Sequence, residues 1–222
     1  GNNHYNLSFS RWNERAFEVA FTKVMPAWKQ IVSKTDPESI EYALAQVLKV
    51  AALHRLADNY GPLPYTRFGK DIYTPYDSQE ELYMTFFKEL DEAIGIMEDF
   101  VSKTPNARPL KDFDLVYEGD FTKWLKFANS LKLRLAMRVV YVDENLARTK
   151  AAEAVKSGVM TVVEDGAMLK SVGGMIVYNP LKKIWDDYSD TRMGANMESF
   201  LKGFDDGRIA VSYTHLTLPT IA

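Results

Sequence analysis

Five long segments with apolar residues at three- and four-residue spacing constrain this chain more than any other feature. That spacing places the apolar side chains on one face of an α-helix. It predicts helices over residues 10–34, 37–60, 78–103, 121–141 and 144–157, with a further helix around 192–202. Because proline lacks a backbone N–H, we expect Pro26 to kink or divide the first of them. The sequence therefore predicts an all-α fold.

Helix-start and helix-stop signals agree with these segments. Asp36 precedes a proline, residues 77–80 have the form of a capping box, Asp120 and Asp143 are expected N-caps, and Gly158 is a stop signal. The first three start signals recur about forty residues apart, a spacing typical of helical elements stacked as in solenoid repeats. We therefore expect a helical repeat scaffold.

Two segments between the helices are too rich in Pro, Gly, Asp and Asn for regular structure. They cover residues 61–76 and 104–119, and we expect both to be irregular loops. A third stretch alternates β-branched residues with glycine, which predicts a short β-hairpin or an irregular excursion near 159–178. Because no linker is long enough to separate two domains, residues 1–210 are expected to form one helical domain.

Two of the helices have faces that define their place in the fold. The helix over 37–60 is apolar over a wide arc, as expected of an inner helix packed between neighbours. One side of the helix over 121–141 carries Trp124, Ala128, Leu131, Leu135 and Val139. The adjacent side carries Lys123, Lys126, Arg134 and Arg138. This basic side is either solvated, paired with acids of 112–120, or used to contact a partner.

Charge and cysteine content exclude several classes of function. The formal net charge is −3, so no field of one sign favours nucleic acid as a partner. Cysteine is absent, which excludes a disulfide framework, a thiolate metal site and a cysteine nucleophile within these residues. No window reaches the roughly 18 apolar residues that span a bilayer.

The last residues differ from the rest of the chain. Residues 211–220, Val-Ser-Tyr-Thr-His-Leu-Thr-Leu-Pro-Thr, match the translation of a transposase mosaic end that runs into a sequencing adaptor. We expect 211–222 to be an adaptor-derived artefact that carries no information about the fold. The natural chain is expected to continue beyond Ala210 and to begin before Gly1.

Three blocks of sequence carry a family resemblance. The first is 58–65, Asp-Asn-Tyr-Gly-Pro-Leu-Pro-Tyr, followed by 75–83, Pro-Tyr-Asp-Ser-Gln-Glu-Glu-Leu-Tyr. The second is 117–138, Tyr-Glu-Gly-Asp-Phe-Thr-Lys-Trp-Leu-Lys-Phe-Ala-Asn-Ser-Leu-Lys-Leu-Arg-Leu-Ala-Met-Arg. The third and weaker is 205–209, Asp-Asp-Gly-Arg-Ile. Together they resemble the SusD/RagB-like family of outer-membrane nutrient-binding lipoproteins, in its SusD-like branch, with departures at Pro62 and Gly207.

The resemblance implies an all-α fold of tetratricopeptide-like helix pairs, with irregular loops forming the ligand face. Members of the family are about twice as long as this chain, so 1–210 is a partial SusD-like domain. The whole protein would face outward at the cell outer membrane, held by an N-terminal lipid anchor absent from these residues. It would capture oligosaccharides, polysaccharides or another nutrient such as a peptide without cleaving them, and deliver them to a SusC-like TonB-dependent transporter. The resemblance implies no cofactor.

Glycan binding requires flat aromatic rings against the apolar face of a sugar, with amide or carboxylate groups for its hydroxyls. Aromatic residues in loops are therefore the candidates, together with one amide. They are Tyr65, Tyr73, Tyr76, Trp185, Tyr188 and Asn179. The alternative is that each of these rings packs its loop onto the helices. Three helical tryptophans, Trp12, Trp28 and Trp124, are expected in the core instead.

Other kinds of site find little support. Asp186 and Asp187 are neighbours, which point about 100° apart on a helix and do not form the facing pair of a glycosidase. The acids of 112–120, which include Asp114, lack the spacing of a calcium loop, so we expect them to lie in a solvated loop. His4 and His54 share no metal-ligand spacing. We expect no catalytic residue and no metal site, and His54 is expected to be a satisfied helix residue.

Two other classes of function remain open. The spacing of the capped helices also fits a helical-repeat scaffold that binds another protein. A carbohydrate-active enzyme is the third candidate. A glycan-binding protein, an interaction scaffold and an enzyme would each require a different kind of site in the structure.

Overall fold

The structure, a computed structural model, describes residues 11–171, 180–188 and 194–209. The chain divides into two compact units. One unit spans Asn6–Lys170, and the other combines Gly1–Tyr5 with Ser171–Ala222. The first unit holds all of the long helices, and the second holds two short described helices.

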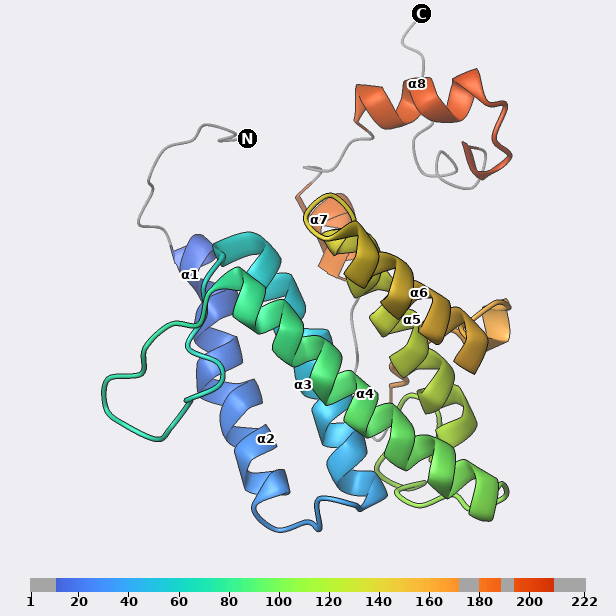
Figure 1. The fold of residues 1–222 in the computed structure, drawn as a ribbon. Coiled ribbons are helices and arrows are strands. Elements are labelled where there is room, and N and C mark those ends of the chain that lie inside the picture. The colour runs from blue at the N-terminus through green and yellow to red at the C-terminus, as the bar shows by residue number, and fades with distance from the viewer. Residues whose placement is uncertain (1–10, 172–179, 189–193, 210–222) are drawn as a thin grey trace, which may run out of the picture. The chain divides into compact units, whose positions relative to one another are not determined.

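The first unit is a stack of antiparallel helices (Figure 1). Its elements are α1 (Arg11–Val19), η1 (Ala20–Val24), α2 (Met25–Val32), α3 (Ile40–Tyr60), α4 (Gln79–Lys103), α5 (Phe121–Val139), α6 (Glu144–Ser157) and η2 (Val163–Asp165). Helix α3 packs against α2 and α4, α4 against α5, and α5 against α6. The predicted all-α, tetratricopeptide-like fold is confirmed.

Proline divides the first helical segment as predicted. The π-helical turn η1 separates α1 from α2, and Pro26 lies in the first turn of α2. Proline at this position removes a backbone donor from the preceding turn, which is where the wider turn is found. The single helix expected over 10–34 is therefore two α-helices joined by one π-turn.

Side-chain caps fix where the longer helices begin. The predicted caps Asp120 and Asp143 are confirmed: Asp120 accepts from the N–H of Thr122, and Asp143 from that of Leu146. Two other starts differ from the prediction. Ser39, not Asp36, caps α3, and a turn at 36–39 precedes it because Asp36 accepts from Glu38. The capping box of α4 also starts one residue later than predicted.

That capping box joins Ser78 and Glu81. The Ser78 hydroxyl accepts from the N–H of Glu81 at 3.2 Å, and the Glu81 carboxylate accepts from the N–H of Ser78 at 2.7 Å. These hydrogen bonds hold the pKa of Glu81 below its usual value. Asp77, predicted to take part in this box, is left free to organise the preceding loop.

The core forms where α3 lies between its neighbours. Helix α3 buries residues on more than one side, including Val47, Val50 and Leu53, which confirms its predicted inner position. Helix α4 adds Phe86 and Phe87, and α5 adds Phe121. The apolar side predicted for α5 is buried from Trp124 to Leu135, with Val139 packed at its edge.

The predicted β-hairpin is not found in the described part of 159–178. Residues 159–171 contain no strand, only the short turn η2, and 172–178 lie outside the described residues. The backbone of this segment bonds to other groups instead: the N–H of Met160 donates to the Ser130 hydroxyl, and that of Thr161 to Asp165. Because these partners satisfy the backbone, the segment packs against α5 without forming a strand.

The second unit contributes two short described helices. They are α7 (Pro180–Asp186) and α8 (Ala195–Gly203). Helix α8 corresponds to the helix predicted around 192–202, whereas the sequence patterns do not predict α7. No helix in the described ranges is long and apolar enough to cross a membrane.

Candidate functional site

The connection between α3 and α4, residues 61–77, is a loop that extends beside α2 (Figure 1). We call it the aromatic loop. Gly61, at φ 77°, ends α3 in a conformation that favours glycine, and its N–H donates to Ala57. At the base of the loop, Leu63 and Asp77 exchange two backbone hydrogen bonds. The loop is therefore closed at its base.

The buried carboxylate of Asp77 holds the first part of the aromatic loop. It accepts from the N–H of Tyr65 at 3.1 Å, and from the N–H and hydroxyl of Thr66 at 2.7 Å each. Further along, the Lys29 ammonium donates to the carbonyl of Gly69 at 2.7 Å. These contacts fix the course of the loop up to residue 69.

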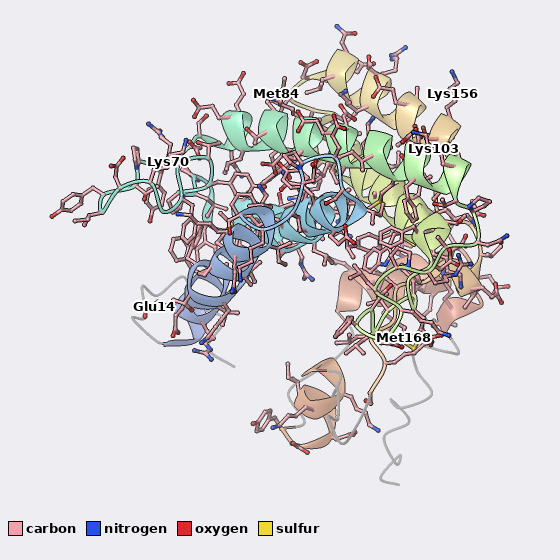
Figure 2. The ribbon with its side chains drawn as sticks, turned by 90° about the horizontal axis from the view of Figure 1, so that it is seen from below. Glu14, Lys70, Met84, Lys103, Lys156 and Met168 are labelled. Atoms are coloured by element: carbon pink, nitrogen blue, oxygen red, sulfur yellow. The ribbon has the colours of Figure 1, made fainter. Side chains whose placement is uncertain are left out.

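Beyond these anchors the tip of the aromatic loop is open to solvent. Ile72 is 96% exposed, Tyr73 is 90% exposed and Tyr76 is 57% exposed. Figure 2 shows the loop, labelled at Lys70, extending away from the helices. Two of the predicted ligand-contact residues, Tyr73 and Tyr76, therefore present their rings to solvent from a loop with a fixed base.

The structure places Tyr65 differently from the other predicted ligand residues. Its side chain is 3% exposed, and its hydroxyl donates to the Glu89 carboxylate. The Lys49 ammonium lies 2.7 Å from Glu89 and is enclosed by the rings of Trp28 and Tyr65, at 3.9 and 4.6 Å. Tyr65 therefore packs the loop onto the helices, which is the alternative to ligand contact, and presents no ring to solvent.

The remaining predicted residues belong to the second unit. Tyr188 is exposed, at 61%. Trp185 lies in α7, but its side chain is not among those described, and Asn179 lies outside the described residues. The structure thus brings together Tyr73 and Tyr76 of the predicted set, and leaves the other exposed ring in a separate unit.

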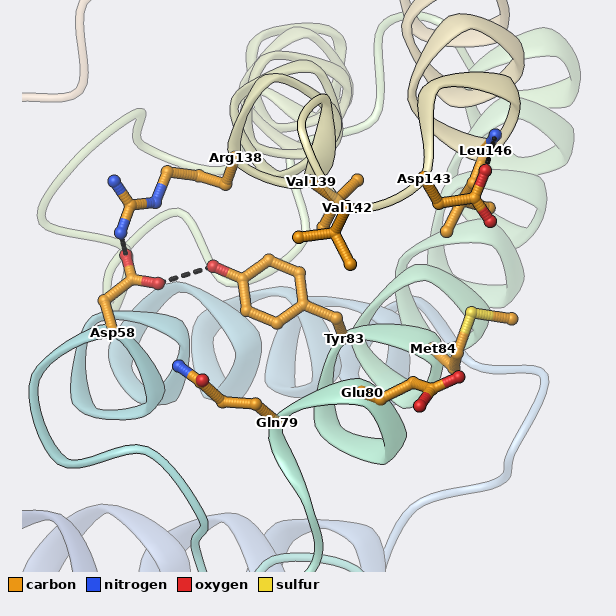
Figure 3. A pocket seen from close by; sticks show the side chains of 10 residues that line it. All are labelled: Asp58, Gln79, Glu80, Tyr83, Met84, Arg138, Val139, Val142, Asp143 and Leu146. Atoms are coloured by element: carbon orange, nitrogen blue, oxygen red, sulfur yellow. Dashed lines mark hydrogen bonds and ion pairs between the residues drawn. The ribbon is translucent and has the colours of Figure 1, made fainter.

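A pocket of about 400 Å³ opens where α3 ends and α4 begins, beside the connection from α5 to α6 (Figure 3). We call it the helix-end pocket. On one side, the Tyr83 hydroxyl donates to Asp58 at 2.5 Å, and Arg138 lies 3.2 Å from the same carboxylate. Burial, with the hydrogen bond to Asp58, raises the pKa of Tyr83 to about 12. Asp58 is thus already engaged by two partners.

The other walls of the helix-end pocket are largely apolar. Met84, Val139, Val142 and Leu146 form most of them, and the carboxylates of Glu80 and Asp143 also line the pocket. Gln79 at the rim donates to the carbonyl of Ala57 and so completes the end of α3. Because the Asp58 carboxylate is occupied, this pocket offers apolar contact more than hydrogen-bonding groups.

A second pocket, of about 450 Å³, is built from loops. Its walls are the connection between α4 and α5, residues 104–120, which we call the pocket loop, the start of α5, and residues 164–170. We call it the loop pocket. Sequence reasoning missed both pockets, because each joins residues that are far apart in the chain.

One buried carboxylate organises the pocket loop. Asp114 accepts from the Trp124 indole at 2.8 Å, and from the N–H groups of Gly119, Val116 and Tyr117 at 2.9 to 3.1 Å. Burial alone would raise the pKa of Asp114, but these hydrogen bonds hold it below its usual value. Asp114, predicted to be a solvated acid, is therefore the centre of this loop.

Residues 159–170, which we call the crossing segment, bond to the pocket loop at several points. The Tyr117 hydroxyl donates to the carbonyl of Asp165 at 2.6 Å, and the N–H of Lys170 donates to the carbonyl of Leu115 at 2.9 Å. Burial, with the nearby charge of Asp165, raises the pKa of Tyr117 to about 12. Both walls of the loop pocket are thus held together.

Residues of the basic side of α5 bond to groups outside 112–120. Lys126 lies 2.8 Å from Asp165, and Arg138 pairs with Asp58 across the helix-end pocket. Lys123 donates to the backbone carbonyl of Glu164 at 2.9 Å. Of the alternatives left open for this side, pairing with acids of 112–120 is not the one that these three residues adopt. The acids that bond to them come from α3 and from the crossing segment.

Metal-ligating side chains do not cluster in the described part of the chain: no group of three His, Cys, Asp or Glu residues there could hold a metal ion. The His54 Nδ1 lies 3.0 Å from the carbonyl of Val50, so one of its ring nitrogens has a helix partner. Burial lowers the pKa of His54, which favours its neutral form.

Comparison with known proteins identifies the family. The model of the SusD-like family, described as SusD and RagB outer membrane lipoproteins, matches residues 1–220. A comparison with curated protein sequences finds no match. This chain belongs to the SusD-like family of outer membrane lipoproteins.

Solved structures of family members are similar over most of this chain. A chitin-binding SusD homologue from Flavobacterium johnsoniae is 39% identical, with a TM-score of 0.79, over 87% of this chain and 40% of its own. A SusD-like protein from Bacteroides thetaiotaomicron is 32% identical, also with a TM-score of 0.79, over 91% and 44%. A homologue from Bacteroides vulgatus is 32% identical, with a TM-score of 0.77, over 90% and 40%. The chain thus spans less than half the length of these proteins.

Proposed function

We propose that the protein captures glycan nutrients at the outer membrane by binding them without cleaving them. The observation that carries the proposal is the pair of exposed tyrosines on a loop whose base is fixed by Asp77. A ring held on an ordered loop loses little conformational entropy when a sugar stacks on it. Membership of a family that includes a chitin-binding homologue supports the same function.

The proposed ligand contacts are Tyr73 and Tyr76. Their exposed rings supply apolar area for the flat face of a pyranose, and their hydroxyls supply hydrogen bonds at its edge. Trp185, Tyr188 and Asn179 remain proposed contacts of the second unit. The rings of Trp124 and Tyr65 do not take part, because both are buried.

Binding of the full chain to a panel of oligosaccharides, including chitin, starch and xylan fragments, tests this proposal by calorimetry. We expect Tyr73→Ala and Tyr76→Ala each to weaken binding about tenfold without changing the melting temperature. Tyr141→Ala is the matched control, since this ring is 99% exposed but lies between α5 and α6. Equal losses in all three variants, or no binding to any glycan, would refute the proposal.

The finer part of the proposal is delivery to a SusC-like TonB-dependent transporter. It rests on the family, and the apolar helix-end pocket is one surface that a protein partner could cover. Co-purification of the full chain with such a transporter, expressed together, tests it. Recovery of the transporter alone, under conditions where a known family pair stays together, counts against delivery.

Enzymatic activity and a purely structural role make different predictions. An enzyme would release new reducing ends from the same glycan panel, and Asp186→Asn would abolish that release. We expect no release. A helical interaction scaffold would bind protein partners but no glycan, so calorimetry on the panel separates it from a glycan-binding protein.

A further inference from the structure

The loop pocket collects positive charge from segments that are distant in the sequence. Arg108 and Lys111 come from the pocket loop, Lys123 from the first turn of α5, and Lys170 from the end of the crossing segment. Three carboxylates also line the pocket, which leaves an excess of one positive charge. The pocket lining therefore carries a net positive charge, whereas the whole chain has a formal net charge of −3.

Two of these cations form ion pairs within 4.0 Å among the described residues and two do not, although the hydrogen bond from Lys170 and, less strongly, the charge of Lys111 lower the pKa of Glu118. Lys170 pairs with Glu118 at 2.5 Å, and Arg108 lies 3.6 Å from Asp120. Across the described ranges, no carboxylate lies within 4.0 Å of the ammonium groups of Lys111 or Lys123. Lys123 is held by a backbone carbonyl, which fixes its position without cancelling its charge. These two ammonium groups can therefore accept an anionic partner.

The third carboxylate of the pocket, Glu164, forms no ion pair with any described residue. It contacts Lys123 through its backbone carbonyl. Its side-chain charge therefore opposes an anion in the same pocket, and removing that charge provides a test of opposite sign to removing a lysine.

The pocket is preorganised by the contacts that build its walls. Asp114 fixes the pocket loop from within, and the hydroxyl of Tyr117 ties that loop to the crossing segment. Glu118 has a φ of 54°, in the left-handed region, and Gly119 follows it at 76°. Backbone held in such conformations is found at binding sites, where the surrounding contacts maintain it. Binding at such a site loses little entropy in ordering the protein.

Apolar area lies beside the unpaired cations. Val116 is half-buried in the wall, and Met168 is 74% exposed at the edge. A volume of about 450 Å³ lies in the range of small-ligand sites. The pocket thus offers apolar contact and fixed positive charge, which together match a sugar ring that carries an acidic group.

We propose that the loop pocket binds an anionic sugar unit, through a uronate carboxylate or a sulfate ester, with Lys111 and Lys123 as the contacting cations. The inference rests on the proposed glycan-binding function and specifies its ligand class. The pocket lies beyond the C-terminal end of α4, whereas the aromatic loop precedes its N-terminal end. A helix of 25 residues separates them by about 37 Å, so the two sites are tested independently.

The test compares each acidic glycan with its neutral counterpart. Trigalacturonate and its methyl ester probe a carboxylate, and κ-carrageenan fragments and their desulfated form probe a sulfate. We expect the full chain to bind at least one acidic member at least tenfold more tightly than its neutral form. That preference should fall as salt is raised, because the contacting groups are partly exposed to solvent.

Three variants locate the effect. Lys111→Gln and Lys123→Gln should each lower affinity for the acidic probe about fivefold or more, and Glu164→Gln should raise it. Lys88→Gln is the matched control, because Lys88 is a solvent-exposed lysine of α4 that pairs with its helix neighbour Glu92. We expect it to leave binding unchanged.

Two results would overturn the inference while leaving the proposed function intact. In the first, the neutral probes bind as tightly as the acidic ones. In the second, Lys111→Gln lowers affinity for the acidic probe no more than Lys88→Gln does. If the unmodified full chain binds no glycan, acidic or neutral, both proposals are overturned. Because Lys111 is exposed and forms no ion pair among the described residues, its variant tests binding without affecting folding.

Discussion

The aromatic loop and the pocket loop are each organised by one buried aspartate, but they differ in how they are anchored to the rest of the chain. Each is a long connection rich in glycine and proline, and in each a single buried aspartate accepts several hydrogen bonds from the loop backbone. Asp77 does this at the end of the aromatic loop, and Asp114 in the middle of the pocket loop. Both loops also expose large apolar side chains: Ile72 and Tyr73 in the aromatic loop, and Phe113 in the pocket loop.

The difference lies in what reaches each loop from elsewhere in the chain. The crossing segment covers the pocket loop and is bound to it through Tyr117 and Lys170. The aromatic loop receives a hydrogen bond from Lys29 to Gly69, and contact of Phe68 with Phe21. The aromatic loop is therefore anchored mainly near its base and leaves residues 72–76 open to solvent, whereas the pocket loop is also bound to the crossing segment and forms the wall of a pocket.

Two glycines provide the largest test of this comparison. Gly61 and Gly119 have nearly the same φ, 77° and 76°. A Cβ at Gly61 would meet nothing within 4 Å, whereas one at Gly119 would lie 2.5 Å from the carbonyl oxygen of Pro109. We expect Gly61→Ala to cost about 2 kcal/mol through backbone strain alone, and Gly119→Ala about 4 kcal/mol because the pocket loop must also shift.

Urea unfolding of the two variants measures this difference. Gly61→Ala measures the cost of a Cβ at a positive φ where it meets no other atom, so a larger loss at Gly119 reports the close contact with Pro109. Equal losses of unfolding free energy would mean that the pocket loop can move away from the added methyl group, and that it is no more tightly held than the aromatic loop.

The two aspartates give the next largest effect. Asp114→Ala leaves the buried Trp124 indole and the Gly119 N–H without an acceptor, and we expect a loss of about 3 kcal/mol. Asp77→Ala should cost about 2 kcal/mol, because it leaves the N–H of buried Tyr65 without an acceptor, whereas Thr66 is exposed and water can replace its lost acceptor. Thermal unfolding followed by tryptophan fluorescence compares them. A larger loss at Asp77 would contradict the more extensive anchoring of the pocket loop.

Local sequence signals predict the helices well and the organisation of the loops poorly. Helix existence follows from local apolar spacing, and Asp120, Asp143 and Gly158 act on the helices beside them in the chain. The start of α3 is ambiguous in the sequence because Asp36 and Ser39 are both competent caps, and only the structure shows which is used. Local sequence signals therefore predict the helices and caps that local interactions determine.

The loop aspartates show what local signals miss. The sequence predicts Asp77 as part of a helix start and Asp114 as a solvated acid, yet Asp77 bonds residues 11 and 12 positions away, and Asp114 bonds an indole 10 positions away. Tyr65 is predicted to face a ligand. Its hydroxyl instead reaches Glu89, 24 positions along the chain, a partner that becomes available only when α3 and α4 pack. Burial of this kind is a tertiary property.

The smallest of these effects concerns the two buried loop tyrosines, and it separates the loops by the kind of acceptor each hydroxyl uses. Tyr65 donates to a carboxylate already paired with Lys49, and Tyr117 donates to the backbone carbonyl of Asp165. A hydrogen bond to a charged group contributes more, so we expect Tyr65→Phe to cost about 2 kcal/mol and Tyr117→Phe about 1 kcal/mol.

Hydrogen exchange of these two variants distinguishes anchoring at the base from anchoring along the length. Tyr117→Phe should raise exchange in the crossing segment, because it breaks a bond between that segment and the pocket loop. Tyr65→Phe should leave exchange at the tip of the aromatic loop unchanged, since residues 72–76 do not depend on that hydroxyl. The opposite result would be faster exchange at the tip of the aromatic loop in Tyr65→Phe and unchanged exchange in the crossing segment in Tyr117→Phe. It would mean that the aromatic loop, and not the pocket loop, is the one anchored along its length.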